Sequence, residues 1–191
     1  MKIEKTEIDG CYILTPNVFR DPRGYFFESY NYDKVKEYID TSFIQDNQSY
    51  SEGPVIRGLH MQMPPYAQAK LVRCINGWIY DVCVDVRPNS PTFGKHVGVF
   101  LTEDNFKQLY IPEGCLHGFS VISYRATVAY KCNNVYNKAS EVGVRYDDPD
   151  LNIHWQFDLK HALLSSKDLE NISFKELCEK LNVSPEGKPH E

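Results

Sequence analysis

The chain has 191 residues, of which 42% are hydrophobic and 25% are charged. This length favours one domain with a substantial core, and the composition is typical of a folded globular protein rather than a disordered one. The formal net charge of −5 argues against broad binding to nucleic acid or to anionic membranes. An anionic ligand would have to be held by a few concentrated Arg and Lys residues.

The N-terminus and the cysteines indicate a cytoplasmic protein. Residues 1–5 contain neither the apolar core nor the cleavage pattern of a signal peptide, and no run elsewhere is long enough to span a bilayer. The six cysteines are scattered without a Cys-x-x-Cys pair, and four of them lie in strand-like apolar runs. We therefore expect reduced, buried thiols, with a disulfide framework as the alternative.

Short aromatic and Val/Ile-rich runs, separated by Gly, Pro, Asn and Asp, predict many short strands. In the first half of the chain, Asn76-Gly77 is a hairpin signal, and Asn31 or Asp33 is a candidate N-cap for one helix. The expected elements are strands at 11–16, 25–30, 43–49, 55–62 and 69–75, a turn at 21–24 and a helix at 31–39.

The second half continues the β pattern and ends in a helix. Residues 78–87 alternate, so that one face carries Tyr80, Val82, Val84 and Val86 and the other carries Asp81, Cys83, Asp85 and Arg87. Ser173-Phe-Lys-Glu176 predicts a capping box, and residues 184–191 are expected to fray. Further strands are expected at 96–101, 108–111, 118–122, 126–132 and 152–155. The pattern predicts a single all-β domain over 1–191, an antiparallel barrel or jelly roll with a few short, mainly C-terminal helices.

The run 55–62 carries the most informative polar residues, because it places Arg57 and His60 inside an apolar strand. Such residues are costly to bury unless they are paired or used. Strict alternation would send them to opposite faces, but Gly58 between them is typical of a bulge that would turn both inward. Taken alone, the residues favour the alternative, with Arg57 exposed at a strand start and His60 a satisfied core residue.

Residues 112–117, Pro-Glu-Gly-Cys-Leu-His, match the Pro-x-Gly-x-x-His turn with which cupin jelly rolls deliver a His into the barrel mouth. A core His at a turn explains this motif alone equally well. The usual cupin metal set needs a His-x-His pair and a later Glu, whereas Met61 and Gln62 follow His60. We therefore expect a cupin that uses neither metal nor cofactor, whose histidines act as acid, base or hydrogen-bond donor.

Lys70, Tyr130 and Tyr136 could share a pocket with these histidines. Each also has a structural explanation, because Lys70 could be a strand-edge residue with its amine in water, and the tyrosines could be ordinary strand aromatics. Two or three cations that converge with aromatic side chains are typical of a site for a diphosphate and a base.

Together these pieces resemble the dTDP-4-dehydrorhamnose 3,5-epimerase family, which are metal-free cupins. The matching segments are 21–28, 45–47, 57–60, 68–72, 85–94, 111–119, 130–131 and 164–168. The resemblance implies an isomerase of dTDP-L-rhamnose biosynthesis that converts dTDP-4-dehydro-6-deoxy-D-glucose into dTDP-4-dehydro-L-rhamnose. It inverts C3 and C5, and no redox cofactor is required because the C4 ketone already acidifies both C–H groups.

The resemblance also implies residue roles. His60 would be the base, Asp168 its orienting carboxylate, Tyr130 the opposing acid and Lys70 the cation near the enolate oxygen. Arg57 and His117 would contact the diphosphate and sugar. The thymidine side would involve Arg23, Phe26, Glu28, Gln45, Asp46, Asn47 and Tyr136, with Glu141 and Lys167 at the rim. Part of that wall would come from a partner subunit, so a homodimer with crossed N-terminal strands is expected.

Three departures from the family pattern concern substrate selectivity rather than reaction class. Cys115-Leu116 replaces a common Phe-Ala, Met61 stands where an aromatic is usual, and Arg145-Tyr146 replaces a Trp-bearing pair. A single-centre epimerase or ketoisomerase on a related nucleotide sugar remains an alternative. So does a non-catalytic cupin that binds sugar nucleotides, although that protein would have no need of the proposed acid and base; a metal-dependent cupin dioxygenase is a third possibility.

Overall fold

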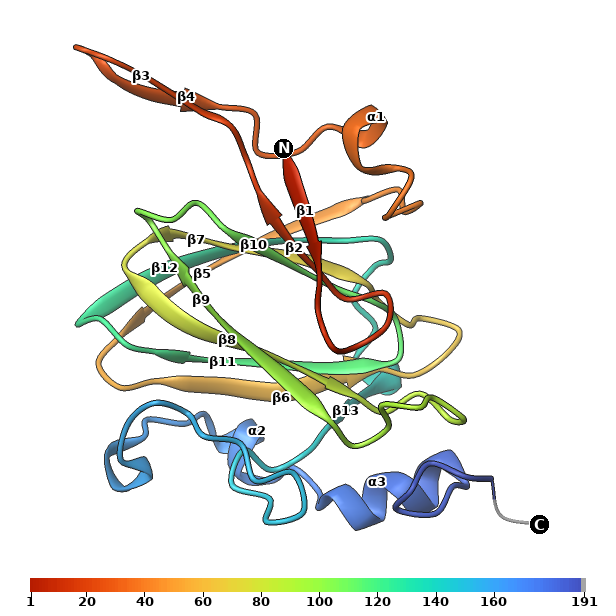
Figure 1. The fold of residues 1–191 in the computed structure, drawn as a ribbon. Helices are drawn as coiled ribbons and strands as arrows, with labels where there is room; N and C mark the ends of the chain where they lie inside the picture. Colours follow the sequence, from red (N-terminus) through yellow and green to blue (C-terminus); the bar gives the residue numbers. More distant parts are fainter. Residues whose placement is uncertain (190–191) are drawn as a thin grey trace.

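Two antiparallel sheets face each other in the computed structural model, which describes residues 1–189 (Figure 1). The six-stranded sheet contains, in spatial order, β1 (Lys2–Lys5), β2 (Tyr12–Thr15), β10 (Gln108–Ile111), β7 (Lys70–Asn76), β12 (Arg125–Cys132) and β5 (Gln45–Glu52). The five-stranded sheet contains β13 (Glu141–Gly143), β6 (Ile56–Gln62), β11 (Cys115–Val121), β8 (Trp78–Asp85) and β9 (His96–Thr102). This arrangement is the predicted all-β fold.

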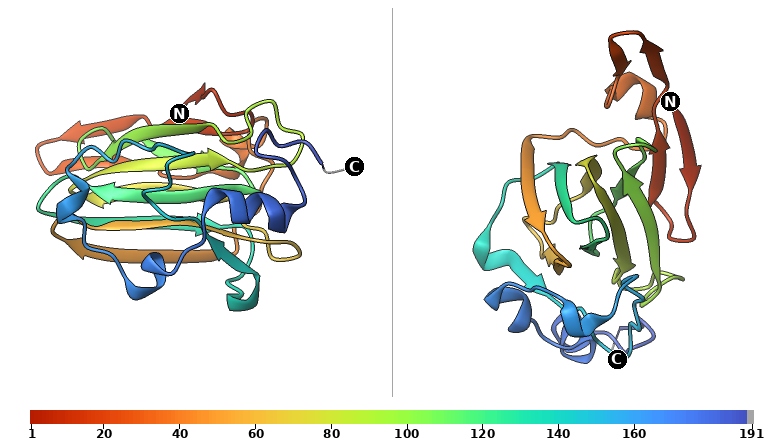
Figure 2. Two further views of the ribbon diagram at one scale, coloured as in Figure 1. Left: turned by 90° about the horizontal axis from the view of Figure 1, so that it is seen from below. Right: turned by 90° about the vertical axis from the view of Figure 1, so that its left-hand side faces the viewer.

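A separate two-stranded hairpin, β3 (Val18–Asp21) and β4 (Gly24–Phe27), stands away from the sandwich (Figures 1 and 2). The helical elements are short: α1 (Tyr32–Val35), η1 (Lys138–Ser140), η2 (Leu159–His161), α2 (Ser166–Leu169) and α3 (Phe174–Leu181). Among the described residues, no helix is long and apolar enough to cross a membrane.

The apolar core has one layer on each side of the five-stranded sheet, and a third, smaller cluster covers the outer face of the six-stranded sheet. Inside the sandwich, residues such as Cys83, Leu109 and Val128 pack between the sheets. On the outer face of the five-stranded sheet, Val84 and Trp155 belong to a second layer beneath the C-terminal segment, which Figure 2 shows lying across the sheet. Both faces of β8 are therefore buried, and the predicted alternation sorts its side chains between the two layers.

The prediction of a hairpin at Asn76-Gly77 is wrong, although the chain does turn there. Gly77 has φ +83°, and a Cβ there would collide with the Arg125 carbonyl. The two strands that it joins lie in different sheets, because β7 pairs with β10 and β12 whereas β8 pairs with β11 and β9. The turn thus carries the chain from one sheet to the other at the end of the sandwich.

Most other elements were predicted with shifted ends. The capping box at Ser173 is confirmed, and Asn31 caps a helix that covers only Tyr32–Val35 of the expected 31–39. Residues 152–155 form no strand and join neither sheet. The side chains of Ile153 and Trp155 are nevertheless buried. β1, β3 and β13 were not predicted. All six cysteines are free and buried, as expected.

The C-terminal segment that was predicted to fray makes backbone contacts in its described residues. Ser184 donates its amide hydrogen to the Lys188 carbonyl, and Val183 bridges Pro189. This segment is therefore tied down through residue 189, because Val183 is also buried in the outer core layer. Residues 190–191 of the predicted frayed tail lie outside the described part of the chain.

Candidate active site

A cavity of about 380 Å³ opens between the two sheets. β6 and β11 contribute one wall, β5, β7 and β12 the other, and β13 and α2 contribute to the rim. The predicted site residues that line it are Gln45, Asn47, Arg57, His60, Lys70, His117, Tyr130, Tyr136, Glu141, Lys167 and Asp168. Residues distant in sequence thus meet at one open end of the sandwich.

The predicted bulge at Gly58 is confirmed, and both Arg57 and His60 line the cavity. His60 lies opposite His117, whereas Arg57 lies opposite Phe119, so β6 has one residue more than β11 between the two pairs. Gly58 has φ +117°, and a Cβ there would lie 2.6 Å from the Gly118 Cα. A glycine is therefore required at position 58, where a side chain would collide with the β11 backbone.

His60 is paired with a carboxylate from the C-terminal segment. Its Nε2 lies 2.7 Å from Asp168 Oδ1, a close contact that is an ion pair only when the imidazole is protonated. Asp168 also accepts hydrogen bonds from the Ser165 hydroxyl at 2.6 Å and from the Gly58 amide at 3.4 Å. Burial acts to raise the pKa of Asp168, but the interactions with His60 and Ser165 outweigh it and hold the pKa below its ordinary value.

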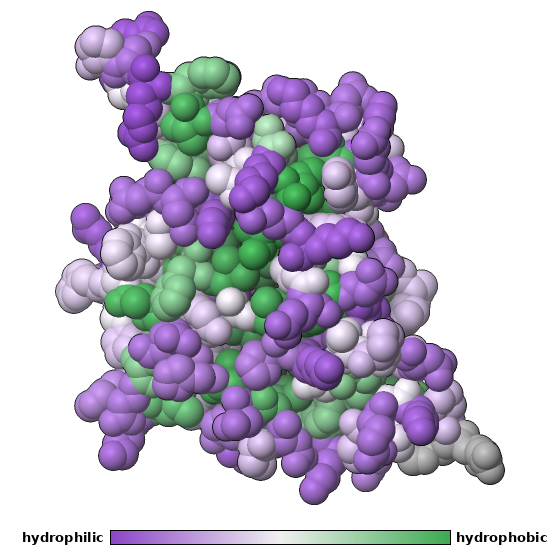
Figure 3. All heavy atoms as spheres, viewed as in Figure 1, coloured by the Kyte–Doolittle hydropathy of each residue, from purple (hydrophilic) through white to green (hydrophobic). Residues whose placement is uncertain are grey.

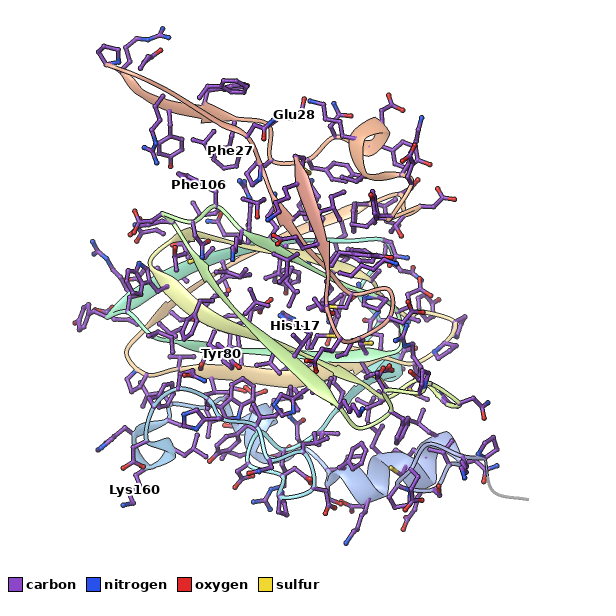
Figure 4. All side chains as sticks on the ribbon, viewed as in Figure 1. Phe27, Glu28, Tyr80, Phe106, His117 and Lys160 are labelled. Carbon is purple, nitrogen blue, oxygen red and sulfur yellow. The ribbon has the colours of Figure 1, made fainter. Side chains whose placement is uncertain are left out.

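His117 forms a second imidazole–carboxylate pair, which the sequence reasoning missed. Its Nε2 lies 2.7 Å from Asp81 Oδ1, and Asp81 is fully buried. Figure 4 shows His117 inside the barrel between the two sheets. Burial raises the pKa of Asp81, partly offset by His117. The sequence did contain a signal for Asp81, because the alternation of residues 78–87 places its carboxylate on the same face as Cys83, which lies between the two sheets.

Lys70 and Tyr130 face the histidines from the other sheet. Lys70 on β7 is 8% exposed, and burial lowers the pKa of its amine. Burial also raises the pKa of Tyr130 on β12, so its side chain is a neutral phenol at physiological pH. The rings of Tyr130 and His117 lie 6.4 Å apart, edge to face. The cavity therefore has imidazole groups on one wall and an amine and a phenol on the opposite wall.

The rim forms a hydrogen-bonded group around Tyr136. The Tyr136 hydroxyl donates to Glu141 at 2.9 Å, and the Lys167 amine lies 2.5 Å from the same carboxylate. Burial would raise the pKa of Glu141, but these two partners lower it overall. Gln45 accepts the Tyr136 amide hydrogen at 2.9 Å. Gln62, not predicted from the sequence, connects this loop to the one after β6: it donates to the Val135 and Tyr66 carbonyls and accepts the Asn137 amide hydrogen.

Four predicted substrate-binding residues do not line the cavity within this protomer. Arg23 pairs with Asp21 at the tip of the β3–β4 hairpin, where its side chain is 90% exposed. Phe26 lies on the same hairpin and is 70% exposed, and Glu28 after it pairs with Lys34. Asp46 alternates with Gln45 and Asn47 along β5, so it points to the outer face and pairs with Lys131. Asp46 therefore lies outside this cavity within the protomer, and its predicted contact with substrate stays a prediction.

The dTDP-4-dehydrorhamnose 3,5-epimerase family model matches residues 5–176. The chain belongs to this family. It is 48% identical over 176 residues to the dTDP-4-dehydrorhamnose 3,5-epimerase of Shigella flexneri, which covers 91% of this chain and 96% of the relative. The family confirms the resemblance found in the sequence, the cupin-like β-sandwich and the classification as an isomerase.

Solved structures agree with this family assignment. The Legionella pneumophila 3,5-epimerase, in complex with dTDP-4-keto-L-rhamnose, has a TM-score of 0.89 at 38% identity over 100% of this chain and 98% of that one. A 3′-monoepimerase from Streptomyces bikiniensis, in complex with dTDP-quinovose, has a TM-score of 0.85 at 30% identity and covers 96% and 91% of the two chains. The fold is thus shared by enzymes that invert one centre and by enzymes that invert two.

Proposed function

We propose that this protein is a dTDP-4-dehydrorhamnose 3,5-epimerase, which converts dTDP-4-dehydro-6-deoxy-D-glucose into dTDP-4-dehydro-L-rhamnose. The observation that carries the proposal is the His60–Asp168 pair on one wall of a cavity whose opposite wall carries Tyr130. A base and an acid on opposite sides of a sugar ring are what an inversion through an enolate requires. Family membership supplies the substrate class.

In the proposed first step, His60 removes the proton from a carbon next to the C4 ketone. Asp168 holds Nε2, so Nδ1 carries the lone pair that accepts the proton, and the imidazolium is stabilised by the carboxylate. The electron pair of the broken C–H bond moves to the ketone oxygen and forms an enolate. Lys70 lies in the same cavity as a cation for that oxygen.

In the second step, the Tyr130 hydroxyl donates a proton to the opposite face of the same carbon, and the enolate returns to the ketone. Water then returns a proton to the phenolate and takes one from His60, so the residues regain their starting state. The two steps, carried out once at C3 and once at C5, give the double inversion. The ketone itself provides the acidity, so the chemistry needs neither a metal nor a redox cofactor.

The nucleotide half of the substrate would lie toward the rim. Arg57 donates to Ser51 and to the Tyr50 carbonyl at the mouth, where its guanidinium is placed to meet a diphosphate. His117 would contact the sugar and diphosphate. Tyr136 is 54% exposed and offers a ring for thymine to stack on. Gln45 and Asn47 would contact the nucleoside, and Glu141 and Lys167 would complete the rim.

We also propose a homodimer of single-domain chains in the cytoplasm. Arg23, Phe26 and Glu28 lie too far out on their own protomer to line its cavity, and a second copy would receive them. An exposed aromatic on a projecting hairpin is typical of a surface that another chain covers. The free cysteines suit a reducing compartment.

Incubation with dTDP-4-dehydro-6-deoxy-D-glucose in D₂O, followed by NMR, tests this function. Deuterium at both C3 and C5, together with the L-rhamno product trapped by a coupled reductase, is expected. Deuterium at one carbon would identify a single-centre epimerase, the second candidate, which the similarity to the Streptomyces bikiniensis 3′-monoepimerase favours. Binding of the sugar nucleotide without deuterium exchange at either carbon would identify the protein as a non-catalytic sugar-nucleotide-binding cupin.

A further inference from the structure

The β3–β4 hairpin is held against its own barrel by aromatic contacts with Phe106, which lies in the loop between β9 and β10. The Phe106 ring meets Tyr25 edge-on at 4.9 Å and Phe27 at 5.1 Å. The Arg20 guanidinium lies 5.5 Å from the centre of the Phe106 ring. Figure 4 shows Phe27 and Phe106 next to each other between the hairpin and the sandwich.

The loop holds Phe106 in a conformation that a phenylalanine rarely adopts. Its φ is +55°, in the left-handed region that is unfavourable for bulky side chains. Two side chains fix the loop around it. The Thr102 hydroxyl accepts the amide hydrogens of Asp104 and Asn105, and the Asn105 amide oxygen accepts those of Thr102 and Lys107. A strained residue that its surroundings over-determine in this way is a candidate for a function.

The contact with Phe106 occupies only one face of the hairpin. Tyr25 and Phe27 alternate with Phe26, which therefore lies on the opposite face with Phe19 as its cross-strand neighbour. Phe26 and Phe19 are 70% and 64% exposed. In Figure 3 an apolar patch lies between the hydrophilic tip of the hairpin and the body of the molecule. The face of the hairpin with Tyr25 and Phe27 thus contacts Phe106, whereas the face with Phe19 and Phe26 is exposed.

We infer that Phe106 is a positioning residue, which sets the direction of the hairpin so that Phe26 and Arg23 can enter the nucleotide half of a second copy's cavity. This inference rests on the proposed function. A two-stranded hairpin has little stability of its own and no preferred direction relative to its barrel. The two edge-to-face contacts and the Arg20 stacking on Phe106 supply that direction before another chain binds.

The variant Phe106→Asn tests the role of the ring, because Asn accepts the left-handed backbone and the loop can stay intact. Phe100→Thr is the matched control, since it also removes a partly exposed ring, 44% exposed, from the outward face of β9. Three quantities are measured: the Kd for dTDP by calorimetry, amide hydrogen exchange in β4 against β12, and KM and kcat for the 4-keto sugar.

We expect Phe106→Asn to weaken dTDP binding about tenfold, as the loss of two aromatic contacts implies. KM should rise in parallel, kcat should stay within about twofold, and β4 should exchange faster while β12 is unchanged. Phe100→Thr should match the wild type. Wild-type dTDP affinity in Phe106→Asn would overturn the inference, even if β4 exchanged faster, because Phe106 would then only stabilise its own loop.

These outcomes separate the inference from the proposed function. A wild-type protein that binds dTDP but incorporates no deuterium into the 4-keto sugar is not an epimerase, yet Phe106→Asn still tests positioning through the dTDP Kd and β4 exchange. A wild-type protein that fails to bind dTDP would overturn both the nucleotide assignment and the role of Phe106.

Discussion

Asp168 Oδ1 lies 2.7 Å from His60 Nε2, and the same carboxylate is fixed by the Ser165 hydroxyl at 2.6 Å. The two residues are 108 positions apart in the chain, and they meet because α2 follows the segment that closes over the outer face of the five-stranded sheet. Ser165 is also the N-cap of α2, so the cap that starts this helix is what orients the carboxylate. The same Ser165 hydroxyl therefore caps the helix and orients the carboxylate that contacts His60.

The variant His60→Asn should lose deuterium incorporation at both C3 and C5 by about 10²–10⁴-fold, because it removes the imidazole that contacts the Asp168 carboxylate of α2. Proton NMR in D₂O measures the loss, and calorimetry with dTDP checks that the site is still formed. His161→Asn, an exposed substitution in η2, is the control. Wild-type exchange in a folded His60→Asn protein would remove His60 from the mechanism.

Tyr130→Phe should separate exchange from inversion. His60 can still remove a proton and return a deuteron to the same face, but the phenol that protonates the other face is gone. Deuterium wash-in should therefore exceed product formation by at least about tenfold, whereas the wild type couples the two. NMR of labelled substrate and product gives both rates, and Tyr124→Phe, 75% exposed, is the control. Equal losses of exchange and inversion would show that Tyr130 is not the opposing acid.

Local sequence patterns predicted the strands and the bulge because both are set by neighbouring residues. Alternation along β8 assigned Asp81 and Val84 to opposite faces, and Gly58 marked the position where β6 takes an extra residue. The close approach of the Gly118 backbone is the physical reason for that glycine. The family roles of His60 and Asp168 came from the resemblance, since no local pattern links them.

Long-range pairing was beyond the reach of those patterns. Asn76-Gly77 predicted a hairpin because such turns usually join paired strands, yet the strands here belong to different sheets. The Asp81–His117 contact was missed because it depends on the register of β8 against β11. Asp46 was assigned to the site with its neighbours, although alternation along β5 turns it outward. In the first two cases the deciding interaction lies between strands that are distant in the chain, whereas the outward orientation of Asp46 could have been predicted from alternation along β5 itself.

Asp85 should make stability depend on pH. It accepts hydrogen bonds from Arg87, Ser90 and Thr92. Burial opposes its ionisation, but these donors, Arg87 first, outweigh burial and lower the pKa of Asp85 to about 2. Because the folded pKa lies below the unfolded value of about 3.9, the ionised group adds roughly 2 kcal/mol of stability above pH ~4. That contribution is lost as the pH falls through the folded pKa.

Urea unfolding of the wild type and of Asp85→Asn at pH 7 and pH 3 measures this effect. The difference in unfolding free energy between the two proteins should be roughly 2 kcal/mol or more at pH 7, and it should be clearly smaller at pH 3. Asp104→Asn, an exposed loop substitution, is the control and should show no such change. An Asp85→Asn deficit of the same size at both pH values would mean that lost hydrogen bonds, rather than ionisation, account for it.

Gly58→Ala should disrupt the site through the backbone. Gly58 has φ +117°, and a Cβ there would lie 2.6 Å from the Gly118 Cα and 2.7 Å from the His117 carbonyl oxygen. Gly24→Ala is a matched control, since Gly24 has φ +134° but no atom within 4 Å of its Cβ position. Both variants carry backbone strain, but only Gly58→Ala also forces β6 away from β11.

We expect Gly58→Ala to lower the unfolding free energy by about 2 kcal/mol more than Gly24→Ala. It should also reduce deuterium wash-in by at least about tenfold, because the bulge that turns Arg57 and His60 into the cavity must shift. Chemical unfolding and NMR exchange in D₂O measure the two effects. Equal stability losses in the two variants, with wild-type exchange in Gly58→Ala, would show that the bulge does not depend on the absence of a side chain at position 58.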